Sequence, residues 1–105
     1  MATTASKIDA NTLKISIDGV LGNVMHKEFR TAYEEEQANK YIIDLANATT
    51  IDSSGLGMLL LFKDHAGGEK SDIEIINCSD HLLDIFHLTC FFRLFKIPEY
   101  SKKYA

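Results

Sequence analysis

The sequence predicts a single α/β domain in which short strands alternate with amphipathic helices. Residues 13–17 alternate apolar and polar side chains, the period-2 pattern of a strand with one covered face and a place at or near the edge of a sheet. Two short apolar runs at residues 41–46 and 73–78 are typical of parallel strands covered on both faces. Because helical patterns separate these runs, we expect residues 1–105 to form one compact unit around one core.

The first helix is expected to begin at Asn23, whose side chain can cap it, and to stop near Asn39-Lys40. The opposite side of the helix is charged, and we expect the glutamates at residues 34–36 to be solvated. The apolar residues that recur at helical spacing, and so should face the sheet, are Met25, Phe29, Ala32 and Tyr33.

A second helix is expected from Ser54 to Ala66, ended by Gly67-Gly68, and it links the two apolar runs into a strand–helix–strand unit. A third helix should begin near Ser79-Asp80. Beyond Thr89 the pattern fits either more helix or a last strand, and we favour a turn and a short strand near residues 95–97. The apolar positions of the third helix are Leu82, Leu83, Ile85, Phe86 and Leu88.

Composition narrows the classes of function. The formal net charge of −4 and the lack of a recurring Lys/Arg cluster argue against direct nucleic-acid binding. The first residues lack the apolar core of a signal peptide, and no apolar run has the length of a membrane span, so we expect a cytoplasmic protein without a membrane segment. Cys78 and Cys90 are expected to be two buried free thiols.

Catalytic and metal-binding patterns are missing from the sequence. No Gly-x-x-x-x-Gly-Lys-Ser/Thr run is present, and neither Ser53 nor Ser54 lies in a Gly-x-Ser-x-Gly elbow. We therefore expect no enzyme activity, no catalytic residue and no cofactor. The histidines share no metal-ligand spacing and are expected at surface or half-buried positions; they are His26, His65, His81 and His87.

The most informative stretch is residues 50–57, Thr-Ile-Asp-Ser-Ser-Gly-Leu-Gly, which connects the central apolar run to the second helix. Asp52 or Ser53 is the natural N-cap, and Ser54 then falls inside the first helical turn. At that position a phosphate on the Ser54 hydroxyl would meet free N–H groups and the positive end of the helix dipole. The stretch predicts a site for a covalent anionic switch.

Gly55 and Gly57 are both unfavourable residues for a helix, because each glycine inside a helix costs about 1 kcal/mol relative to alanine. Close backbone packing onto a strand is one explanation. Room for another protein's active site to approach Ser54 is the other, and both stay open.

The second helix also carries more apolar residues than one face needs. Met58 and Leu61 are expected to project away from the sheet, where either a neighbouring helix or a partner protein would cover them. The residues expected to face the sheet are Leu56, Leu59, Leu60 and Phe62.

The run at residues 41–45, followed by residues 51–57 and supported by residues 26–29 of the first helix, resembles STAS domains. More narrowly, it resembles the stand-alone bacterial anti-sigma factor antagonists, over nearly the whole chain. The resemblance implies one STAS domain over residues 1–105, with a mixed β-sheet and helices packed mainly on one face. One departure is Cys90-Phe91, where members of that family often carry Gly-Leu.

The resemblance also implies a partner-switching role in transcription regulation. Ser54 would be phosphorylated by an anti-sigma factor that is also a serine kinase, and a serine phosphatase would reverse the modification. The unmodified form would bind the kinase, and the phosphorylated form would be released. The residues expected to bind the partner are Asp52, Ser53, Ser54, Gly55, Gly57, Met58 and Leu61.

A phosphoserine adds a charge of about −1.5 to −2, which the helix N-terminus tolerates but a packed interface does not. The switch is therefore expected to act on association rather than on folding. The competing hypothesis is a constitutive interaction module or ligand-sensing module whose serine is never modified.

Overall fold

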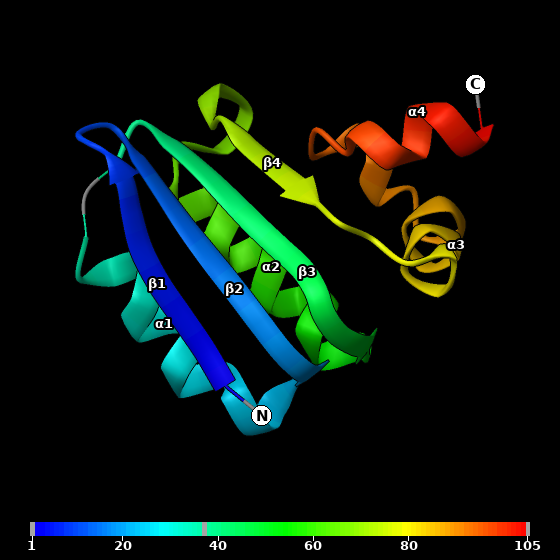
Figure 1. The fold of residues 1–105 in the computed structure, drawn as a ribbon, viewed down its shortest axis with the longest axis horizontal. Helices are drawn as coiled ribbons and strands as arrows, with labels where there is room; N and C mark the ends of the chain where they lie inside the picture. The colour runs from blue at the N-terminus through cyan, green and yellow to red at the C-terminus, as the bar shows by residue number, and fades with distance from the viewer. Residues whose placement is uncertain (1, 37, 105) are drawn as a thin grey trace.

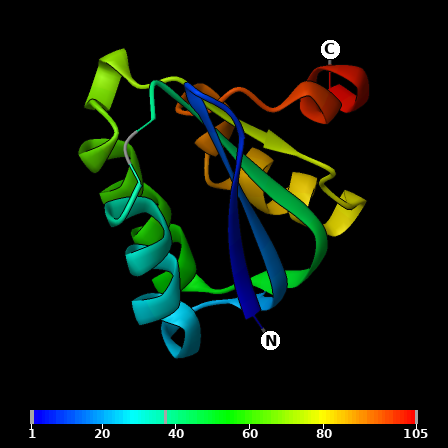
Figure 2. The same ribbon diagram turned by 60° about the vertical axis from the view of Figure 1, so that its left-hand side comes forward.

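The computed structural model describes residues 2–36 and 38–104, which form a four-stranded sheet of order β1-β2-β3-β4 (Figures 1 and 2). β1 runs antiparallel to β2, whereas β2, β3 and β4 are parallel to one another, so the sheet is mixed. The strands are β1 (Ala2–Asp9), β2 (Thr12–Leu21), β3 (Lys40–Ile51) and β4 (Ile73–Ile76).

Two helices lie side by side against one face of the sheet (Figure 2), α1 (His26–Glu34) and α2 (Ser53–His65). Two others gather beside β4 (Figure 1), α3 (Asp80–Leu88) and α4 (Pro98–Tyr104). Single turns of 3-10 helix join these elements: η1 (Asn23–Met25), η2 (Gly68–Lys70) and η3 (Phe91–Arg93). The predicted α/β class and the placement of helices mainly on one face are confirmed.

The core is one cluster of buried side chains from the sheet and the helices. Inward-facing residues of β2 and β3 alternate with half-buried ones, as a sheet with one packed face requires. Aromatic rings then hold α1 and α2 on it: Phe62 of α2 meets Phe29 of α1 at a centroid distance of 5.6 Å and Tyr41 of β3 at 5.1 Å. These edge-on contacts fix the position of α2, and with it the start of that helix.

Several predicted boundaries are confirmed. The run at residues 41–46 lies in β3, between two parallel neighbours, as expected, but the strand continues past it to Ile51. Ser79 caps α3 by accepting a hydrogen bond from the Leu82 amide at 3.2 Å. α2 ends before Gly67, whose φ of +120° is the left-handed backbone that glycine adopts at little cost.

Other expectations are wrong. β1 was not predicted, because most of its residues are small or polar and they show no hydrophobic period. Asn23 does not cap a helix with its side chain. The strand expected near residues 95–97 is reduced to one isolated parallel bridge between Lys96 and Glu74, and α4 follows it at once.

Cys90 is exposed, contrary to the expectation of two buried thiols, and Cys78 is half-buried. Burial and the nearby Glu99 raise the pKa of Cys78 to about 12. Cys90 follows the C-cap of α3, Thr89, and has φ +61° and ψ +21°. This left-handed conformation is the one that glycine favours after a helix, so a cysteine at position 90 strains the backbone.

Replacing Cys90 by glycine is therefore expected to raise the free energy of unfolding by about 1 kcal/mol. Urea unfolding followed by circular dichroism measures the change. The control is Cys90→Ala, which removes the thiol but keeps a Cβ in the left-handed conformation and should leave stability nearly unchanged. Equal stability of all three proteins would show that the turn carries no strain.

Candidate functional site

The N-terminus of α2 is capped by Asp52, one of the two residues predicted for this role. Asp52 has extended backbone (φ −92°, ψ −179°), and its Oδ1 accepts a hydrogen bond from the Gly55 amide at 2.8 Å. Its carbonyl accepts the Leu56 amide at 3.0 Å, the first backbone bond of the helix. Ser54 lies in the first turn, as predicted.

The hydroxyl of Ser54 is held at the surface by the same carboxylate. Ser54 is exposed, and its Oγ donates a hydrogen bond to Asp52 Oδ1 at 2.6 Å. The Ser54 hydroxyl, followed by the Gly55 amide, lowers the pKa of Asp52 below its ordinary value. At neutral pH the site therefore presents an oriented hydroxyl next to an ionised carboxylate.

Two glycines let the end of β2 pack against this cap. A Cβ on Gly55 would lie 2.0 Å from the carbonyl oxygen of Leu21, and a Cβ on Gly22 would lie 2.3 Å from Asp52 Oδ2. The Asp52 amide donates to the same Leu21 carbonyl at 3.2 Å. Close packing is thus the reason for Gly55. The sequence gives no sign that Gly22 meets Asp52.

Close packing does not explain the glycine at position 57. A Cβ placed there would meet no described atom within 4 Å beyond its immediate helical surroundings. The helix therefore bears the cost of a glycine without gaining a close contact inside the domain. Open space at Gly57, one turn after Ser53 and Ser54, leaves a smooth surface beside the two serines.

The outward face of α2 differs from the prediction. Met58 was expected to project outward but is 4% exposed, whereas Leu60, expected to face the sheet, is 45% exposed. Leu61 is 59% exposed, as predicted. The spacing of the buried residues at i, i+3, i+4 and i+7 was the signal that could have identified the inner face, which consists of Gly55, Met58, Leu59 and Phe62.

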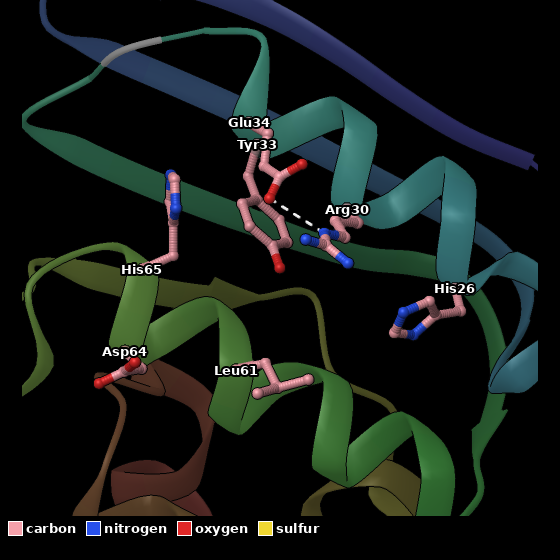
Figure 3. Close-up of a pocket in the computed structure, with 7 residues that line it drawn as sticks. All are labelled: His26, Arg30, Tyr33, Glu34, Leu61, Asp64 and His65. Atoms are coloured by element: carbon pink, nitrogen blue, oxygen red, sulfur yellow. Dashed lines mark hydrogen bonds and ion pairs between the residues drawn. The ribbon is translucent and has the colours of Figure 1, made fainter.

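A cleft of about 300 Å³ opens between α1 and α2, with Leu61 on one wall (Figure 3). On the opposite wall, formed by α1, Arg30 and Glu34 make an ion pair at 3.0 Å. The hydroxyl of Tyr33, also on α1, points into the space between the helices. Burial raises the pKa of Tyr33. Only Leu61 of the seven lining residues was predicted as a site residue, and the others are His26, Arg30, Tyr33, Glu34, Asp64 and His65.

A matched pair of alanine substitutions separates the two glycines of α2. Gly55→Ala should lower the free energy of unfolding by about 1–3 kcal/mol, because its Cβ collides with the backbone of Leu21. Gly57→Ala should raise it by up to about 1 kcal/mol through helix propensity. Urea unfolding of both variants measures the difference. Destabilisation by Gly57→Ala would contradict the open surface described above.

The Asp52 carboxylate should also give a defined pH dependence. Since its folded pKa is lowered, its contribution to stability is present above the unfolded pKa, near 4, and is lost as pH falls through the folded pKa. The difference in unfolding free energy between the wild type and Asp52→Asn should therefore shrink between about pH 5 and about pH 2. Thermal unfolding at several pH values measures it, and parallel profiles would argue against an ionised cap.

Within residues 2–36 and 38–104, no helix has both the length and the apolar character needed to cross a membrane. The same part of the chain contains no cluster of three or more histidine, cysteine or acidic side chains arranged to hold a metal ion.

The fold and the sequence are both similar to known STAS proteins. The "Mlab, STAS domain" family model matches residues 4–94. A STAS-domain containing protein of Pseudomonas aeruginosa (strain UCBPP-PA14) is 46% identical over 100 residues, which cover 92% of this chain and 99% of the relative.

Solved structures of low sequence identity share the fold. The anti-sigma factor antagonist SpoIIAA in its unphosphorylated form matches with a TM-score of 0.75 at 17% identity, covering 97% of this chain and 92% of that one. The Bacillus cell fate determinant SpoIIAA in the phosphorylated form matches with a TM-score of 0.65 at 17% identity, covering 97% of both chains. A putative anti-sigma factor antagonist from Thermotoga maritima has a TM-score of 0.75 at 17% identity, covering 90% and 84%. The chain belongs to the STAS domain family.

Proposed function

We propose that this STAS domain is an anti-sigma factor antagonist switched by phosphorylation of Ser54. In its unmodified form it binds an anti-sigma factor that is also a serine kinase, and phosphorylation releases it. The observation that carries the proposal is the exposed Ser54 hydroxyl, oriented by Asp52 at the start of α2 and next to the open surface of Gly57. SpoIIAA, which shares the fold, has been solved in both unphosphorylated and phosphorylated forms, and this supports the proposal.

Electrostatics explain why a phosphate here would act on binding rather than on folding. The positive end of the α2 dipole tolerates the added charge, while the ionised Asp52 beside it repels the phosphate outward. An outward phosphate lies in the path of any partner that covers α2. The partner must then desolvate that charge or dissociate, so affinity falls while the domain stays folded.

The proposed binding surface follows the exposed residues of α2. Asp52, Ser53, Ser54 and Leu61 offer side chains, and the half-buried Gly57 offers bare backbone between them. Gly55 and Met58, predicted as binding residues, are buried and would shape this surface from beneath. Leu60 was not predicted, and its exposed side chain extends the apolar part of the surface.

The remaining roles follow from this mechanism. A serine phosphatase restores the unmodified form, and the kinase supplies the catalytic groups, so this chain acts as a substrate and binding protein rather than an enzyme. The proposal places residues 1–105 as one domain in the cytoplasm, without direct contact to nucleic acid.

The second candidate is a ligand-sensing module, and the cleft between α1 and α2 favours it (Figure 3). The cleft combines an apolar wall at Leu61 with the polar groups of Tyr33 and Arg30. On this hypothesis a small molecule in the cleft would change the partner affinity of α2, and Ser54 would only support the helix cap.

Phosphorylation can be tested directly with the candidate anti-sigma serine kinases of the source organism. After incubation with ATP, intact-mass measurement should show one added phosphate, and peptide mapping should place it on Ser54. Ser54→Ala should abolish uptake, whereas the neighbouring Ser53→Ala should retain it. Equal uptake by Ser54→Ala would overturn the site assignment.

Release is tested by Ser54→Asp, which adds a negative charge at the same position. We expect partner affinity to fall by at least about tenfold, equivalent to 1.4 kcal/mol, with little change in melting temperature. Calorimetric titration and thermal unfolding measure the two quantities, and Ser54→Asn is the uncharged control. A loss of binding that came with unfolding would favour a structural role for Ser54.

A further inference from the structure

We infer that the free edge of β1 is a dimerisation surface, on which a second copy of this chain pairs its own β1 antiparallel. β1 is the outermost strand of the sheet and pairs with β2 on one side only (Figure 1). Residues 4–9 are exposed. An edge strand of this kind presents backbone donors and acceptors that another strand can pair with.

One hydrogen bond shows which residues face outward. The Thr3 amide donates to Glu28 Oε2 of α1 at 3.3 Å, so the Thr3 N–H points away from β2. In an antiparallel strand alternate residues direct both backbone groups to the same side, and the register with β2 is regular from Ala2 to Lys7. Thr3, Ala5 and Lys7 therefore form the row that a second strand would meet.

Two copies of this row can pair with each other around a two-fold axis that passes between the two Ala5 residues. When Ala5 of one copy faces Ala5 of the other, Thr3 faces Lys7 twice, related by the two-fold axis. Odd residues then face odd residues, so the helices of both copies lie on the same face of one continuous sheet. The small side chains at the centre let the two strands approach to the usual spacing of about 4.8 Å.

Charge specifies the same register. Glu28 already reaches Thr3, the residue that Lys7 of the second copy would face. The Lys7 ammonium group donates to the Ala10 carbonyl oxygen at 3.3 Å in the single chain and would turn from there to Glu28 of the second copy. Glu28 would exchange the Thr3 amide for the ammonium group of Lys7, and the amide would pair with the second strand. Two symmetric ion pairs would then close the interface at its ends.

A groove between β1 and α1 adds further surface to this interface. About 380 Å³ of open space lies between β1 and α1, lined by small and polar residues. The second copy would cover this groove and bring its own α1 alongside. The lining residues are Thr3, Ala5, Lys27, Glu28, Thr31 and Ala32.

Charge reversal tests both the surface and the register. Sedimentation equilibrium of the full chain should show a reversible monomer–dimer system. Lys7→Glu and Glu28→Lys alone should each weaken dimerisation by at least about tenfold, because like charges then face each other twice. An equimolar mixture of these two variants should regain the dimer, since both ion pairs form again in the heterodimer.

Cross-linking supplies a second measurement. In a Cys90→Gly background, Ala5→Cys should form an intermolecular disulfide on oxidation, because facing residues of a hydrogen-bonded pair have Cα atoms about 5.5 Å apart. Ser6→Cys, which faces Thr4 in this register, is the control and should not cross-link efficiently. A monomer at every concentration, dimers that resist both charge reversals, or a mixture that stays monomeric would overturn the inference.

Discussion

The Asp52 carboxylate is the interaction on which the rest of the site depends. One oxygen accepts both the Gly55 amide and the Ser54 hydroxyl, so the group that starts α2 also orients the proposed phosphorylation site. The position of Asp52 is fixed by the end of β2, which packs against the cap because Gly22 and Gly55 place no Cβ between them. The geometry of Ser54 is therefore a property of the packed sheet rather than of a flexible loop.

The same arrangement separates the residues that hold the fold from those of the proposed binding surface. The inner face of α2 is fully occupied by core contacts, with Leu59 and Phe62 buried. Its outer face keeps Gly57 and two exposed leucines, which contribute little to the fold of the isolated chain. A charge added at the start of the outer face can change what binds there while the core remains intact.

The strands and helices with strong hydrophobic periods could be predicted from sequence, and so could Asp52 as a cap candidate. β1 could not, because most of its residues are small or polar and it is held by pairing with β2. The inner face of α2 was misassigned at Met58 and Leu60, since nearly every side of that helix is apolar. Gly22, Gly55 and Gly57 look alike in sequence, and only the distances to Leu21 and Asp52 separate packing from open surface.

The most direct test of the proposed switch is to install phosphoserine at position 54 during synthesis and to compare this protein with the unmodified chain. The binding constant of each form for the anti-sigma kinase and the melting temperature of each form are measured under the same conditions. The account predicts tight binding only by the unmodified form and nearly equal melting temperatures. Equal affinity of the two forms would contradict it.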